Sequence, residues 1–218
     1  MESNQKKGRA AKGYKKLKAW HKWVSIVLTL FVLLFALSGI VLNHRSWFSE
    51  VDVNRNLLPK DYRYHNWNLA SVRGSVEKDT NEILVYGNIG VWKANGDFSQ
   101  FEDFNNGFPE GIDNRKISKI IQSERGDLIA GTYFGLYAWK EDRWEKLPLP
   151  VDEDRIVDLI EHDGKLNILT RSNLIIANFD QPTDEAKVIM LPKAEDDDNK
   201  IGLFKTLWVI HSGEIYGF

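Results

Sequence analysis

Three of the five histidines in this chain lie where an apolar segment begins or ends. His21 precedes the apolar run of residues 24–42 and His44 follows it, while His211 lies in an aromatic-rich segment near the C-terminal end. Neutral imidazole is a common metal ligand and a good axial ligand for haem iron. The positions of these histidines therefore suggest ligand chemistry at membrane boundaries. No set of residues in the sequence suggests a catalytic site.

His21 and His44 cannot bind the same ion if the segment between them is one helix. At about 1.5 Å and 100° per residue, they would lie roughly 34 Å apart along the axis and about 140° apart around it. Each would serve its own site, one near each face of a membrane. His211 would lie at a depth close to that of His44, in a segment that re-enters from the outer side. The alternative, which residue type alone favours, is that these histidines only occupy the headgroup layer.

The element that would position these side chains is a membrane-spanning helix, predicted over residues 23–44. Its uncharged run, residues 24–42, is roughly 28 Å long as a helix, close to the ~30 Å hydrocarbon core of a bilayer. Lysine and arginine crowd residues 1–22, and this basic tail predicts a cytoplasmic N-terminus. Aromatic residues flank both ends of the run: Trp20, Trp23, Trp47 and Phe48. The remainder of the chain is then expected outside, in the periplasm if this is a bacterial inner membrane.

Two alternatives to this interpretation are weaker. A cleaved signal peptide has an apolar core of about 7–15 residues and a small-x-small cleavage site, and none is found before Trp47. The basic tail, residues 1–22, could also bind nucleic acid, but beside a span it is explained by orientation and by attraction to anionic lipid. We therefore expect membrane lipid, and no nucleic acid, among the partners.

Composition limits the chemistry of the rest of the chain. A length of 218 residues suits one span and one external domain of about 150 residues. The formal net charge of −2 conceals a basic start and an acidic remainder. The chain has no cysteine, which excludes disulfides, thiolate metal sites and cysteine nucleophiles.

Residues 45–194 are predicted to form an external all-β domain. Short alternating apolar runs are separated by turn signals that contain glycine, as antiparallel hairpins require. An internal repeat relates residues 117–139 to residues 156–177. The matched pairs are Ile117 with Ile156, Ile121 with Ile160, Gly126 with Gly164, and Leu136 with Leu174.

A fainter copy of the repeat covers residues 83–92 and aligns Gly90 with Gly135. The offsets of 45 and 38 residues lie in the blade-length range of β-propellers. Three blades do not close a typical propeller. We therefore predict an antiparallel hairpin array that resembles an incomplete β-propeller. Its repeat pattern resembles the sensor domains of some two-component regulators. Five aromatic residues would either form a ligand cradle or, as we favour, pack the hairpins together: Trp92, Tyr133, Tyr137, Trp139 and Trp144.

The C-terminal part departs from this pattern. Residues 195–202 form an acidic stretch, which we interpret as a solvated linker rather than a cation site. Residues 203–218 are apolar and aromatic, and are predicted to start a second, truncated membrane segment.

Two sequence motifs flank the external domain. The first is Trp20-His-Lys-Trp23 together with Leu37-Ser-Gly-Ile-Val-Leu-Asn-His44, and the second is His211-Ser-Gly-Glu-Ile-Tyr-Gly217. The first resembles the initial span of the PepSY-associated transmembrane proteins. The second is similar to that family's HxGxxxG element, which opens the next span. The central domain departs from the family's common PepSY-type α/β domain.

The resemblance implies an inner-membrane protein of iron uptake. Some members of the family look like reductases that carry haem b and pass electrons outward to ferric siderophores. It implies that His21 ligates a haem on the cytoplasmic side and that His44 and His211 serve a haem on the outer side. A membrane-anchored periplasmic binding or sensing module is the alternative interpretation.

One departure from the family pattern bears on activity. The family carries further spans after the HxGxxxG element, whereas this sequence ends at Phe218. We therefore expect either a truncated product, inactive alone, or a partner subunit that supplies the missing transmembrane helices. Membrane oxidoreductase activity is expected only of a full-length form.

Overall fold

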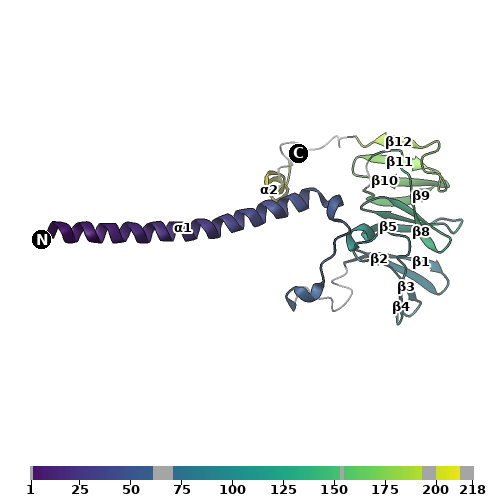
Figure 1. Ribbon diagram of the computed structural model, residues 1–218. Helices are drawn as coiled ribbons and strands as arrows, with labels where there is room; N and C mark the ends of the chain where they lie inside the picture. The colour runs from purple at the N-terminus through teal and green to yellow at the C-terminus, as the bar shows by residue number, and fades with distance from the viewer. Residues whose placement is uncertain (1, 61–70, 153–154, 193–199, 212–218) are drawn as a thin grey trace. The chain divides into compact units, whose positions relative to one another are not determined.

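The computed structural model describes residues 2–60, 71–152, 155–192 and 200–211, and the side chains from residue 13 onward. These residues belong to two units, Met1–Phe48 with Asn199–Phe218, and Ser49–Asp198 (Figure 1). His65, the acidic run 195–198 and the glycines of the second histidine motif lie outside the described residues.

A single long helix, α1 (Glu2–Asn43), carries both the basic tail and the apolar run. It contains no proline and is rich in leucine, alanine and lysine, which are good helix formers. Its segment Gly13–Asn43 is long and apolar enough to cross a membrane, and none of its most apolar window is buried in protein. A helix that is apolar all round and unburied needs lipid around it. After His44 the chain turns into a short 3₁₀ helix, η1 (Arg45–Phe48).

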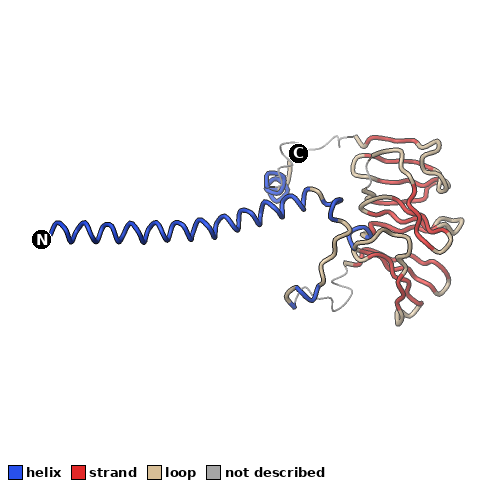
Figure 2. Tube along the Cα trace, viewed as in Figure 1, coloured by secondary structure: helices blue, strands red, loops and turns tan. Residues whose placement is uncertain are grey.

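The second unit, Ser49–Asp198, contains three four-stranded antiparallel sheets, which we call blades A, B and C (Figure 2). Blade A consists of β1 (Val72–Asp79), β2 (Glu82–Gly87), β3 (Gly90–Asn95) and β4 (Phe101–Asp103). Blade B consists of β5 (Ile117–Gln122), β6 (Leu128–Thr132), β7 (Leu136–Lys140) and β8 (Arg143–Leu147). Blade C consists of β9 (Asp158–His162), β10 (Lys165–Leu169), β11 (Asn173–Ala177) and β12 (Lys187–Met190). Among the described residues, the connections include the short 3₁₀ helices η2 (Arg55–Leu57) and η5 (Ile112–Arg115).

The blades stack in chain order through their first strands, because β1 contacts β5 and β5 contacts β9. Within each blade, each strand pairs with the next one along the chain. The array is open, since the described part of the chain forms three blades that do not close into a ring. The prediction of one apolar helix followed by an incomplete propeller-like sheet array is therefore confirmed.

Two hydrophobic cores hold the blades together. The core between blades A and B includes Leu84, Tyr86, Val91, Ile117, Leu128, Ala130, Tyr137 and Trp144. The core between blades B and C includes Ile129, Leu136, Ala138, Ile156, Leu159, Leu166, Ile168 and Ile175. Trp139 packs against the first core, so three of the five aromatic residues singled out above pack hairpins together, as expected.

The internal repeat extends to a threonine that sequence matching missed. Thr132 ends β6, and its amide and hydroxyl both donate to the carbonyl of Gly135. Thr170, just past β10, donates to Asn173 in the same way. Both threonines are buried, at 0% and 2% exposure. Each threonine therefore closes the turn between the second and third strands of its blade. Thr132 and Thr170 are equivalent positions, and they define how blades B and C align.

Blade C sits close to blade B because of one glycine. A Cβ atom on Gly131 would lie 2.5 Å from Cγ2 of Ile156, so any side chain there would push the blades apart. The Ile156 amide donates to the Thr132 carbonyl at 3.0 Å, and its carbonyl accepts from the Ser118 hydroxyl at 2.6 Å. Backbone contacts of this kind set the relative position of the two blades.

Candidate functional site

The two histidines of α1 are both exposed and lie at opposite ends of its apolar run. Nδ1 of His21 lies 3.3 Å from the Ser25 hydroxyl, one helical turn further on. The His44 ring stacks on Trp47, with ring centroids 4.2 Å apart and planes 13° apart. These contacts engage one nitrogen of His21 and one face of His44, so both imidazoles keep a nitrogen that a ligand could reach.

His211 is the last residue of the short helix α2 (Leu203–His211), and its side chain is exposed. At about 1.5 Å per residue, nine residues reach roughly 13 Å, less than half of a bilayer core. The helix is apolar, and its exposed side chains include Leu203, Phe204, Leu207, Trp208 and Ile210. The described part of α2 thus suits an interfacial position, and its length alone does not span a membrane.

The structure does not bring His21 and His44 together. His21 lies on α1 and His44 directly follows its last residue, Asn43, so a separation of about 34 Å along the helix axis is expected. Among the described residues, no group of three or more His, Cys, Asp or Glu side chains is placed to hold a metal ion.

Each end of α1 fits half of a haem site. Axial ligation needs one imidazole with a free Nε2, and the Ser25 contact at Nδ1 leaves that nitrogen of His21 available. An exposed apolar side chain lies about one helical turn before each histidine, Leu17 before His21 and Val41 before His44, and would suit the face of a porphyrin. A second axial ligand at either end would come from a facing helix, as in helix bundles that bind haem.

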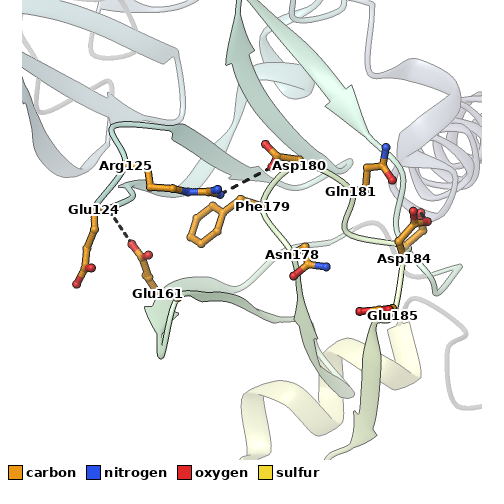
Figure 3. A pocket seen from close by; sticks show the side chains of 11 residues that line it. Glu124, Arg125, Glu161, Asn178, Phe179, Asp180, Gln181, Asp184 and Glu185 are labelled. Carbon is orange, nitrogen blue, oxygen red and sulfur yellow. Dashed lines mark hydrogen bonds and ion pairs between the residues drawn. The ribbon is translucent and has the colours of Figure 1, made fainter.

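A separate cleft of about 1130 Å³ lies in the β unit, where blades B and C meet (Figure 3). Three loops line it: the β5–β6 turn, the β9–β10 turn and the β11–β12 connection. Five of the lining side chains are carboxylates: Glu124, Glu161, Asp180, Asp184 and Glu185. Arg125 is the only basic side chain among the lining residues.

The cationic side chain in this cleft is engaged within the protein. The Arg125 guanidinium lies 3.9 Å from Asp180 and 3.5 Å from Asp127, and 5.7 Å from the centre of the Phe179 ring. One Glu161 oxygen accepts from the backbone amide of Glu124 at 2.9 Å (Figure 3). The remaining carboxylates leave the cleft with an excess of negative charge.

The sequence analysis missed this cleft because its acids are scattered over residues 124–185. One signal was present in the repeat. Gly126 and Gly164 mark equivalent turns of two blades, and equivalent turns lie at the same end of neighbouring blades. The carboxylates near these two glycines could therefore have been grouped in advance.

The N-terminal part of the chain is similar to a known protein family. Residues 13–86 match the family model described as "Putative PepSY_TM-like". The match includes the apolar part of α1, both of its histidines, and β1. The resemblance of the first motif to this family is therefore confirmed, and with the apolar helix it shows that α1 anchors the chain in a membrane. The comparison with curated proteins gives no match.

Solved structures resemble part of the chain more distantly. One is the extracellular domain of the "putative one component system BT4673" from B. thetaiotaomicron, with 19% identity and a TM-score of 0.46 over 55% of this chain. Another is that of the "putative hybrid two component system BT3049" from the same organism, with 12% identity and a TM-score of 0.44 over 61%. The matched parts make up 16% and 18% of those two chains.

Proposed function

We propose, from the match of residues 13–86 to the PepSY-associated transmembrane family, that the chain serves in haem-linked electron transfer across a membrane. The observation that carries the proposal is the placement of His21 and His44. Both lie in the matched segment, both are exposed, and the helix between them has the length of a bilayer core. An electron path across a membrane needs one ligand near each face.

The orientation follows from charge. The lysine-rich start of α1 is expected on the cytoplasmic side of a bacterial inner membrane, and the β unit on the outer side. His21 would then hold a haem b near the cytoplasm and His44 a haem b near the outer face. His211 would be a second ligand on the outer side. Facing helices from a partner subunit, or from a longer form of the chain, would complete the ligand sets.

The chemistry proposed for such a system is one-electron transfer toward an outer acceptor, of which a ferric siderophore is one candidate. Bound haem would supply the redox couple, and axial ligands and burial would set its potential. This chain's own contribution would be to hold each haem at a fixed depth.

Haem binding can be tested by spectroscopy on the full chain, purified in mild detergent together with the subunit that supplies its facing helices, from membranes of cells supplied with haem. We expect a Soret band with the low-spin features of bis-imidazole ligation. His44→Ala or His211→Ala should remove the outer-side haem, and His21→Ala the other, because each loses an axial ligand. His162→Ala is the matched control, since this exposed histidine lies in blade C, far from α1 in the sequence. A protein without Soret absorption, or variants with unchanged haem content, would contradict the proposal.

The acidic cleft favours a second candidate, an anchored module that binds cationic ligands. Five carboxylates around a volume of about 1130 Å³ suit a polyamine or a lysine-rich peptide better than a neutral ligand. Spermidine should bind the full chain with an affinity that falls as salt is added. Asp184→Asn with Glu185→Gln should weaken binding about tenfold, since roughly 1.4 kcal/mol is lost with two charges. Glu141→Gln, in the exposed β7–β8 turn, is the control, and equal affinity in all variants would contradict this candidate.

A further inference from the structure

The β unit carries basic side chains at the end of the blades that lies opposite the acidic cleft. The cleft includes the turns between the first and second strands of blades B and C. Antiparallel strands reverse direction at each turn, so the turns between the second and third strands lie at the other end of each blade. Cationic side chains at that other end include Arg73, Lys116, Arg155 and Arg171. This end is therefore where an anionic ligand is to be sought.

Two of these arginines, from different blades, converge on the ring of Tyr133. The guanidinium carbon of Arg73, in blade A, lies 5.3 Å from the ring centre, and Nη2 of the same side chain donates to the Tyr133 hydroxyl at 2.7 Å. The guanidinium carbon of Arg155, in the segment that enters blade C, lies 4.2 Å from the same centre. The two guanidinium carbons are therefore no further apart than the sum of these two distances, 9.5 Å. Two positive charges are thus held beside one aromatic ring.

An irregularity in β1 directs Arg73 toward the next blade. The register of β1 with β2 shifts between residues 72 and 74, and a shift of this kind re-aims a side chain. Blade B has the same irregularity at Ser118, whose hydroxyl donates to the Ile156 carbonyl of blade C. Nε of Arg73 also donates to the Asn88 side chain at 3.2 Å. The Arg73 guanidinium is therefore held in place by hydrogen bonds to two side chains.

Tyr133 and Arg155 are positioned by the backbone around them. The Tyr133 amide donates to the Lys116 carbonyl at 3.2 Å, in the turn that Thr132 closes. Arg155 directly precedes Ile156, which is fully buried and whose amide donates to the Thr132 carbonyl at 3.0 Å. The side chains of Tyr133 and Arg155 are both half-buried. A ligand at this place would meet groups that are already ordered, which lowers the entropic cost of binding.

The two guanidiniums have no counter-charge of their own. Among the described residues, neither Arg73 nor Arg155 makes an ion pair with a carboxylate. Asp152 and Asp158, three residues to either side of Arg155 in the sequence, are exposed and do not pair with it. Like charges held close together repel, and the face of an aromatic ring offsets only part of that repulsion. A bound anion would remove it.

We propose that Arg73 and Arg155, held by Tyr133, form a binding site for a phosphate group, either free phosphate or a phosphate monoester. A guanidinium presents a planar fork of N–H donors that matches phosphate oxygens. One fork satisfies a carboxylate, whereas two forks and two charges suit a tetrahedral dianion. The site lies within the β unit and uses no histidine, so it does not depend on the haem proposal.

Calorimetric titration tests the site in the full chain, purified in an uncharged detergent without phosphate, such as dodecyl maltoside. Inorganic phosphate should bind at low salt with a dissociation constant below about 1 mM. The affinity should fall as sodium chloride is added, because both guanidiniums are partly open to solvent. Acetate, which carries one charge and suits one fork, should bind roughly tenfold more weakly at the same ionic strength.

Substitutions of the two arginines locate the binding. Arg73→Gln and Arg155→Gln should each weaken phosphate binding about ten- to a hundredfold, because each removes a charged donor. Arg73→Lys and Arg155→Lys keep the charge and lose the fork, so their affinities should fall between those of the wild type and the glutamine variants. Arg143→Gln is the matched control. It removes the same charge from an exposed arginine of β8 that is paired with Glu145, and should leave the affinity unchanged.

The source of the phosphate group is separated by reconstitution of the full chain in phosphatidylcholine nanodiscs. One set contains phosphatidic acid, a phosphate monoester, and a second set contains phosphatidylglycerol, an anionic diester. Free phosphate that binds more weakly only with phosphatidic acid would identify a lipid headgroup as the occupant. Equal affinity in both sets would identify a soluble phosphate.

Each outcome decides the proposal. Phosphate binding that both glutamine variants weaken and Arg143→Gln leaves unchanged supports it. A wild-type protein that does not bind phosphate overturns it, as does an equal loss of affinity in Arg143→Gln. Circular dichroism verifies that the variants fold. If a glutamine variant unfolds, the lysine variant at the same position decides, and an affinity equal to that of the wild type overturns the proposal.

Discussion

Replacing Trp144 by alanine is expected to lower the free energy of unfolding of the β unit by about 3–5 kcal/mol. Trp144 is 1% exposed and belongs to the core between blades A and B. Its ring stacks on Phe108 at 5.3 Å and meets Trp139 edge-on at the same distance. Its Nε1 donates to the carbonyl of Phe104 at 2.8 Å. The substitution would leave a large cavity and a buried carbonyl without that donor.

The free energy is measured by urea denaturation of the full chain in detergent, followed by near-ultraviolet circular dichroism. Trp144→Phe separates the loss of ring packing from the loss of the hydrogen-bond donor, because phenylalanine keeps most of the packing and lacks the donor. We expect this variant to lower the free energy of unfolding by about 1–3 kcal/mol. Trp47→Ala is the control of the same residue type, since Trp47 is 72% exposed and belongs to the other unit. A loss below about 1 kcal/mol for Trp144→Ala would show that blades A and B do not share a packed core.

The parts of the fold that follow from local pattern were predictable from the sequence. Residues 24–42 are uniformly apolar, and a helix satisfies all backbone groups of such a segment within itself. The repeat of residues 117–139 in residues 156–177 predicted two similar blades, because equal spacing of apolar and turn residues yields equal hairpins. Gly126 and Gly164, at φ of 90° and 67°, occupy the equivalent turns that the matching required.

The parts that depend on distant contacts were not predictable. The acidic cleft forms only because blades B and C pack together, which no local spacing encodes. The interblade role of Gly131 depends on Ile156, which lies in another blade's entry segment. The helix also begins earlier than the predicted span of residues 23–44, at Glu2, because the basic tail itself consists of good helix formers.

The candidate haem site was likewise predictable from the sequence only in part. The sequence positions of His21 and His44 already predicted that they lie at the two ends of the span. The structure places both histidines at those ends. Their side-chain contacts with Ser25 and Trp47 were not foreseen, although spacings of four and three residues allow both. The second axial ligand of each site is a tertiary or intersubunit feature, and local pattern does not supply it.

Two lysines in the middle of α1 should release the chain from the membrane. Leu33 and Leu34 lie near the centre of the apolar run and are 54% and 60% exposed, so their side chains face the lipid. A lysine at the centre of a spanning helix costs about 2.5–3.5 kcal/mol on insertion scales, so Leu33→Lys with Leu34→Lys should cost roughly 5–7 kcal/mol. From that depth a lysine does not reach the headgroups easily. We expect the double variant to appear in the supernatant after carbonate extraction, where the wild type stays with the vesicles.

Leu17→Lys is the matched control. Leu17 is 63% exposed on the same helix, but it lies in the basic tail, where one more cation adds to the attraction for anionic lipid. That variant should stay with the membrane. The released double variant should keep the circular dichroism of its β sheets, because both interblade cores lie within Ser49–Asp198. If the double variant instead resists carbonate extraction, α1 does not insert as a single span, and the placement of His21 and His44 at opposite membrane faces fails with it.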